Sequence, residues 1–182
     1  MGFTFTQTGI EGLVVIEPKL YGDERGYFAE TWNLRDFEQG GLPMQFVQDN
    51  QSKSQKGVLR GMHYQIKNPQ GKLVRVVSGR VFDVAVDLRK NSPTCGKWYG
   101  ITLCAEKMNM LYVPEGFAHG FLTLTEYAEF TYKCTRFYDP RDEGGLQWND
   151  PDVGIGWPDI GIPFALSEKD KNNTAYSEVN FF

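Results

Sequence analysis

The sequence predicts an all-β domain, most simply a jelly-roll β-barrel with few short helices. Short segments in which apolar and polar residues alternate recur along the chain, as expected of strands with one buried face. Asn, Asp, Gly and Pro separate these segments at short intervals, and helical periodicity is scarce. Many short strands with frequent turns are typical of a sandwich or barrel.

The expected strands are rich in β-branched and aromatic residues, which favour extended backbone. Turn signals such as Asn91-Ser92-Pro93 and Asp139-Pro140 lie between them. In chain order, we expect strands at residues 3–7, 13–18, 26–31, 46–50, 73–78, 81–88, 97–103, 110–113, 120–125 and 129–135.

The segments 73–78 and 81–88 are separated by Gly79-Arg80, which predicts a two-residue hairpin turn. Side chains alternate between the two faces of a strand, so the second segment divides into two sets. One face carries Phe82, Val84, Val86 and Leu88, and the other carries Val81, Asp83, Ala85 and Asp87.

Two short helices are expected. Asn33 is a good N-cap for a helical turn through Phe37, which Gly40-Gly41 would end. The second helix would follow Ser167, with acidic residues, including Asp170, in its first turn.

Composition limits the classes of function. The 182 residues have the size of a single domain, which we expect to span 1–182. Residues 150–182, whose first part is rich in Gly and Pro, are expected to wrap the barrel. A net charge of −4 argues against a nucleic-acid partner, and no apolar run is long enough to predict a membrane span. Three cysteines without paired spacing predict free thiols and a cytoplasmic protein.

The only two histidines lie in short segments flanked by glycine, at His63 and His119. Histidine is the side chain whose ordinary pKa lies nearest neutrality, which makes it the first candidate for proton transfer. The spacing Pro114-x-Gly116-x-x-His119 resembles the second motif of the cupin superfamily of small barrels. The first cupin motif is half present, because Gln65 stands where a second histidine ligand would be, so we expect no metal site.

Longer segments extend the resemblance along nearly the whole chain. They are similar, in order and spacing, to the motif series of dTDP-4-dehydrorhamnose 3,5-epimerases: residues 23–30 (DERGYFAE), 48–50 (QDN), 57–65 (GVLRGMHYQ), 71–75 (GKLVR), 114–121 (PEGFAHGF), 132–134 (YKC) and 166–170 (LSEKD). That family epimerises both carbons next to the ketone of a dTDP-4-keto-6-deoxy sugar, the precursor of L-rhamnose, without a cofactor. The resemblance also implies a homodimer.

The resemblance assigns four catalytic residues. His63 is the base that removes the α-proton, and Asp170 orients it. Lys72 stabilises the charge on the enolate oxygen, and Tyr132 returns a proton to the opposite face.

The resemblance assigns the remaining site residues to binding of the dTDP-sugar. They are Arg25, Phe28, Glu30, Gln48, Asn50, Arg60, His119, Tyr138, Glu143 and Lys169. Guanidinium groups suit the diphosphate, and an aromatic ring suits the thymine base.

The residue patterns leave other interpretations open. By pattern alone, His63 is a satisfied core residue, Tyr132 a packed strand residue and Lys72 a strand-edge lysine, while Arg25 and Glu30 form a surface ion pair. Among functions, a single-site 3- or 5-epimerase remains an alternative. A metal-dependent cupin would contain stoichiometric Fe, Mn or Zn, and a non-catalytic sugar-binding cupin would lack the base and acid.

Overall fold

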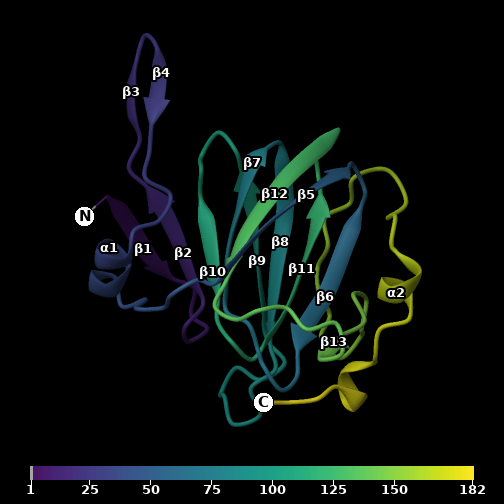
Figure 1. The fold of residues 1–182 in the computed structure, drawn as a ribbon. Helices are drawn as coiled ribbons and strands as arrows, with labels where there is room; N and C mark the ends of the chain where they lie inside the picture. The colour runs from purple at the N-terminus through teal and green to yellow at the C-terminus, as the bar shows by residue number, and fades with distance from the viewer. Residues whose placement is uncertain (1) are drawn as a thin grey trace.

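Two antiparallel sheets face each other in the computed structural model, which describes residues 2–182 (Figure 1). The first sheet has six strands in the order β1 (Phe3–Gln7), β2 (Val14–Pro18), β10 (Met110–Val113), β7 (Lys72–Ser78), β12 (Tyr127–Cys134) and β5 (Gln48–Gln55). The second has five, in the order β13 (Glu143–Gly145), β6 (Leu59–Gln65), β11 (Phe117–Thr123), β8 (Arg80–Asp87) and β9 (Trp98–Cys104). The predicted all-β jelly-roll class is confirmed.

The main core lies between the two sheets. From the six-stranded sheet, Val74 and Phe130 point inward, and from the five-stranded sheet, Ala85 and Phe121 do so. The rings of Phe121 and Phe130 stack with centroids 4.4 Å apart, which ties the two layers together. This apolar packing fills one part of the barrel and leaves the polar site beside it.

The outer face of the five-stranded sheet is covered by the C-terminal part of the chain. Val84 and Val86 on β8 pack there against Val153, Val179 and other side chains from residues 146–182. Val81 and Ala85 point to the opposite, inner face. The predicted division of this strand into two faces is confirmed.

The first predicted helix, α1 (Leu34–Gln39), covers part of the other outer face. Asn33 caps it by accepting a hydrogen bond from the backbone N–H of Asp36 at 2.8 Å, and Gly40 is its C-cap. Phe37 is fully buried, with its ring 5.1 Å from that of Phe3. The local capping signals therefore defined this helix correctly.

The segment between β2 and α1 forms a hairpin of β3 (Tyr21–Asp23) and β4 (Gly26–Phe28). It projects away from the barrel (Figure 1). The strand expected at 26–31 ends at Phe28, because the chain turns back toward α1 after leaving its single partner strand. Tyr27 and Phe28 are 66% and 67% exposed.

The predicted hairpin between β7 and β8 is wrong. The two strands are consecutive in the chain but belong to different sheets, since β7 pairs with β10 and β12 while β8 pairs with β11 and β9. Gly79 makes the corner with a φ of +76°, and a Cβ there would lie 2.2 Å from the carbonyl oxygen of Tyr127. Glycine thus lets the chain cross from one sheet to the other.

Other boundaries also moved. Strand β6 was not among the expected strands, although it contains the His63 motif. Strand β5, expected at residues 46–50, runs from Gln48 to Gln55. It lies at the edge of its sheet and carries polar side chains on both faces, so the sequence shows no alternation that would mark its full length.

The second predicted helix is confirmed as α2 (Glu168–Lys171), and a 3₁₀ turn, η1 (Tyr176–Glu178), follows it. Within residues 2–182, no helix has the length and apolar character needed to cross a bilayer.

Candidate active site

Two adjoining cavities lie between the sheets, with volumes of about 350 and 290 Å³. His63, Lys72 and Tyr132 line both of them. His63 comes from β6 in the five-stranded sheet, whereas Lys72 and Tyr132 come from β7 and β12 in the six-stranded sheet. The cavity therefore has an imidazole on one wall and a phenol and an ammonium on the other.

His63 is held by Asp170. The Nε2 atom of His63 lies 2.5 Å from Oδ1 of Asp170, whose side chain is only 5% exposed. Asp170 belongs to α2, whose N-cap Ser167 accepts a hydrogen bond from the Asp170 backbone N–H at 3.1 Å. A helix of one turn thus places the carboxylate against a strand residue 107 positions earlier in the chain.

The state of Asp170 follows from its surroundings. Burial raises the pKa of its carboxyl, but hydrogen bonds from His63, Ser167 and the backbone, with the charge of His63, more than offset this, so the pKa lies below its ordinary value. An ionised carboxylate only accepts hydrogen bonds. In the neutral imidazole this bond places the ring proton on Nε2, which faces Asp170, and leaves the other nitrogen with the lone pair that a base requires.

The opposite wall is set by strand register. Tyr132 lies beside Val74 on one neighbouring strand and Asn50 on the other, and Cys134 lies beside Lys72. Alternation points these side chains into the barrel. Burial raises the pKa of the Tyr132 phenol, and the nearby Cys134 raises it further. Burial lowers the pKa of the Lys72 ammonium.

Close approach of β6 and β11 depends on two glycines. Gly61 has a φ of +137°, and a Cβ on it would lie 2.6 Å from the Cα of Gly120. The register between these strands shifts between His119 and Phe121. Glycine at both positions lets the two backbones pass close together and sets where His63 enters the cavity.

His119 lies directly beside His63 in the strand register and lines the smaller cavity. Its Nε2 atom is 3.0 Å from both carboxylate oxygens of Asp83, whose side chain is fully buried. Asp83 was not among the predicted site residues. The available signal was a charged residue in the middle of an apolar strand, a position where an unpartnered charge is costly.

Besides His119, six predicted binding residues surround the cavities. Gln48, Asn50, Tyr138 and Glu143 line the larger one, and Arg60 and Lys169 line the smaller one. Most of them contact one another: Gln48 donates a hydrogen bond to Asn50 at 3.0 Å and accepts one from the backbone N–H of Tyr138 at 2.9 Å. Lys169 forms an ion pair with Glu143. Arg60 donates to the hydroxyl of Ser54 at 3.0 Å.

Gln65 stands where the cupin pattern has a second histidine, and its amide is fully engaged. Its nitrogen donates to the carbonyl of Asn68 at 2.8 Å, and its oxygen accepts from the backbone N–H of Asp139 at 2.8 Å. Among residues 2–182, no group of three or more His, Cys, Asp and Glu side chains is placed to hold a metal ion.

Three predicted binding residues lie away from these cavities within the same chain. Arg25 is on the projecting hairpin, where its guanidinium pairs with Asp23 at 2.5 Å and is 84% exposed. Phe28 ends the same hairpin, and Glu30 follows it and accepts a hydrogen bond from Asn33 at 3.0 Å. Their roles in binding stay predictions.

Comparison with known proteins identifies the family. The profile of the dTDP-4-dehydrorhamnose 3,5-epimerase family matches residues 7–178. A protein of that name from Methanothermobacter thermautotrophicus is 53% identical over 93% of this chain and 92% of its own length. One from Pseudomonas aeruginosa is 51% identical over 97% of this chain and 98% of its own.

Solved structures agree with this assignment. The crystal structure of a dTDP-6-deoxy-D-glucose-3,5-epimerase from Legionella pneumophila, in complex with dTDP-4-keto-L-rhamnose, superposes with a TM-score of 0.91. It is 49% identical and covers 94% of this chain and 91% of that one. The cupin-type barrel, the site on its interior and these relatives agree: this chain is an epimerase that belongs to the dTDP-4-dehydrorhamnose 3,5-epimerase family.

Proposed function

We propose that this enzyme converts dTDP-4-keto-6-deoxy-D-glucose to dTDP-4-keto-L-rhamnose by inverting C3 and C5, without a cofactor. The observation that carries the proposal is the base on one wall of the cavity and the acid on the other. His63, held by Asp170, lines the same two cavities as Tyr132 and Lys72 from the opposite sheet. Inversion of a carbon requires this arrangement, because the proton leaves from one face and returns to the other.

The first step is removal of a proton next to the ketone. The ring nitrogen of His63 that does not face Asp170 takes the α-proton, and the C–H electrons move into the C–C bond as the carbonyl oxygen becomes an enolate. The Asp170 carboxylate stabilises the imidazolium that forms. The Lys72 ammonium balances the charge on the enolate oxygen.

The second step returns a proton to the other face. Tyr132 donates its phenolic proton to the carbanionic carbon, the ketone reforms, and solvent restores both residues. C3 and C5 flank the same C4 ketone, so one base, one acid and one enolate site serve both carbons. The reaction moves protons only, and no electron acceptor enters the proposal.

The residues around the cavity mouths are proposed to bind the nucleotide. Arg60 and Lys169 supply positive charge for the diphosphate. Tyr138 is 48% exposed at the edge of the larger cavity, where its ring is placed to stack on thymine. Gln48, Asn50 and Glu143 offer hydrogen bonds, and His119 contacts the sugar from the smaller cavity.

We also propose a cytoplasmic homodimer. Its three cysteines are free, as expected in a reducing compartment. Strand β1 is at an edge of its sheet, and the projecting hairpin exposes Tyr27 and Phe28. A second copy would cover these rings and give Arg25, Phe28 and Glu30 a cavity to reach. Light scattering would then give twice the chain mass of 20.7 kDa.

The first test is proton NMR of dTDP-4-keto-6-deoxyglucose with the enzyme in D₂O. Deuterium should enter at both C3 and C5, and His63→Asn should abolish the exchange. Exchange at one carbon would instead support a single-site epimerase. Binding without exchange would support a sugar-binding protein, and stoichiometric Fe, Mn or Zn in active enzyme would support a metal-dependent cupin.

A further inference from the structure

Asp83 is a fully buried carboxylate beside the site, and neither the base nor the acid of the proposed reaction accounts for it. Its strand neighbours on the same face, Val81 and Ala85, belong to the apolar core. An ion in such a place is costly unless it is paired. Its bond partner is His119, which lies within 3.0 Å of both carboxylate oxygens and lines the cavity.

Lys72 is the other basic side chain near Asp83. It shares the smaller cavity with His119, and it also borders, with His119, a small void at the base of the barrel. Burial raises the pKa of the Asp83 carboxyl, and the charges of His119 and then Lys72 oppose this rise. Burial lowers the pKa of the Lys72 ammonium, and the charges of Cys134 and then Asp83 oppose this fall. Asp83 and His119 are buried, and Lys72 is half-buried beside them.

The other groups that face Lys72 are less suited to keep it charged. Cys134 lies beside it on β12, and burial raises the pKa of that thiol, which favours the neutral form. Glu143 on β13 also acts on Lys72, but it is paired with Lys169 at the mouth. His63 and Tyr132 line the same cavities, and Val113 on β10 is apolar. Glu143 therefore already has an ammonium partner in Lys169, whereas the ion-pair partner of the buried Asp83 is the imidazole of His119.

We propose that Asp83 is a positioning residue for the epimerisation: its carboxylate fixes His119 against the cavity and keeps the Lys72 ammonium protonated where the enolate oxygen forms. This inference rests on the proposed function. A neutral lysine could not balance the enolate charge, so the reaction would slow although His63 and Tyr132 remain in place. A displaced His119 would also let the sugar shift from its reacting geometry, which lowers kcat further.

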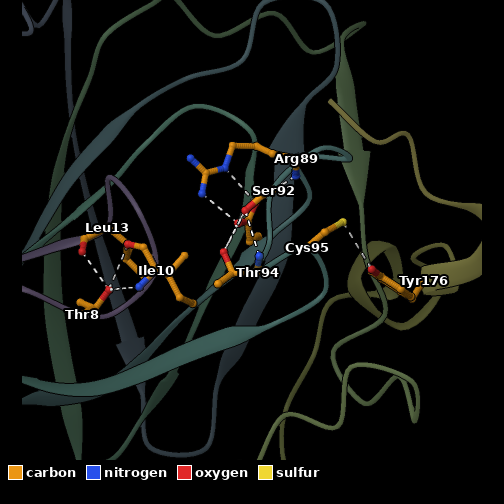
Figure 2. Close-up of polar contacts among 9 residues, drawn as sticks. Thr8, Ile10, Leu13, Arg89, Ser92, Thr94, Cys95 and Tyr176 are labelled. Carbon is orange, nitrogen blue, oxygen red and sulfur yellow. Dashed lines mark hydrogen bonds and ion pairs between the residues drawn. The ribbon is translucent and has the colours of Figure 1, made fainter.

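The chain offers a matched control in Asp87. It lies on the same strand and the same inner face as Asp83, four residues on, and its side chain is also fully buried. Its carboxylate is held by Arg89, Ser92 and Thr94, none of which lines either cavity of the site. Figure 2 shows these three side chains close together. Asp87→Asn therefore removes an equally buried charge without touching the site.

The test compares Asp83→Asn with Asp87→Asn and the parent enzyme. For Asp83→Asn we expect kcat to fall roughly 10- to 100-fold at neutral pH while KM changes much less. The alkaline limb of kcat should move to lower pH by about one unit, because loss of a neighbouring anion lowers the pKa of an ammonium. Asp83→Glu should restore part of both, and Asp87→Asn should keep the parent kcat and pH profile.

A direct measurement covers the case in which Asp83→Asn does not fold. In the parent enzyme labelled with ¹³Cε-lysine, the Lys72 resonance, assigned by its loss in Lys72→Arg, should titrate above neutral pH. Titration below pH 7, or a folded Asp83→Asn with parent kcat and pH profile, would overturn the inference. If the parent enzyme shows no exchange in D₂O, the proposed function fails first, and that outcome is separate.

Discussion

His63 and His119, the two histidines of the chain, lie opposite each other on adjacent antiparallel strands, and each is bound by a different carboxylate. His63 pairs with Asp170 and keeps 32% of its side chain exposed to the cavity, whereas His119 pairs with Asp83 and is 8% exposed. The difference in exposure agrees with the two roles proposed for them. The exposed imidazole is placed to exchange protons, and the buried one is placed to form a fixed contact.

Replacing Asp170 should remove the orientation of the base without removing the base. Asp170→Asn lets the ring proton move to the nitrogen that should take the substrate proton, so kcat should fall by roughly 10²- to 10⁴-fold. Steady-state rates and ¹⁵N-histidine spectra would measure the two effects. A variant with parent kcat would show that the contact with His63 is structural only.

Replacing Tyr132 should separate proton removal from proton return. In Tyr132→Phe, His63 still removes the α-proton, so exchange in D₂O should continue while inversion slows by roughly 10²- to 10⁴-fold. Tyr127→Phe on the same strand is the control, because Tyr127 is exposed at the far end and lines neither cavity of the site. Inversion at the parent rate in Tyr132→Phe would assign the acid to another group.

Crowding at Gly61 should displace the base. In Gly61→Ala, the added Cβ meets the Gly120 Cα at 2.6 Å on a residue with φ of +137°. We expect a loss of roughly 1–3 kcal/mol of stability, together with a lower kcat because β6 carries His63. Gly9→Ala provides the control, since Gly9 has a φ of +88° and nothing within 4 Å of the added atom. Denaturant unfolding and kcat would be measured for both.

If Gly61→Ala and Gly9→Ala lose stability equally and both keep kcat, then backbone conformation alone matters. In that case the close approach of β6 and β11 does not set the position of the base.

Asp87 should make stability depend on acid pH. Burial opposes ionisation of this carboxyl, but hydrogen bonds from Arg89, Ser92 and Thr94 lower its pKa from 3.8 to about 2. Because its pKa is lower in the folded than in the unfolded chain, the ionised Asp87 carboxylate stabilises the fold at pH values above the pKa of the unfolded chain. This stabilisation of about 2 kcal/mol is lost as the pH falls from about 4 to 2.

The measurement is denaturant unfolding of the parent enzyme and Asp87→Asn at pH 7 and at pH 2.5. The variant should be the less stable at pH 7, and the difference between the two proteins should shrink at the lower pH. Comparing the two proteins cancels the effects of other carboxyls. A difference that does not change with pH would mean that the Asp87 pKa is not depressed in the fold.

Features that depend on neighbouring residues could be predicted from the chain alone. Alternation on 81–88 assigned its two faces correctly, since side-chain direction in a strand is fixed by the backbone. Asn33 and Ser167 marked the starts of both helices, because a cap bonds to backbone groups two or three residues on. The family motifs also marked His63, Lys72 and Tyr132, which line one pair of adjoining cavities.

Strand pairing and the contacts between charged groups depend on segments that lie far apart in the chain. Gly79 has the local signature of a hairpin turn, yet β7 and β8 join different sheets because both edges of each strand find partners elsewhere in the chain. Likewise, the contact of His63 with Asp170 spans 107 residues. No preference of the intervening chain specifies such a contact. It forms because the C-terminal segment runs back along β6, where Leu59 donates to the carbonyl of Ala165 at 3.0 Å and Asn173 donates to the carbonyl of Gly61 at 3.1 Å.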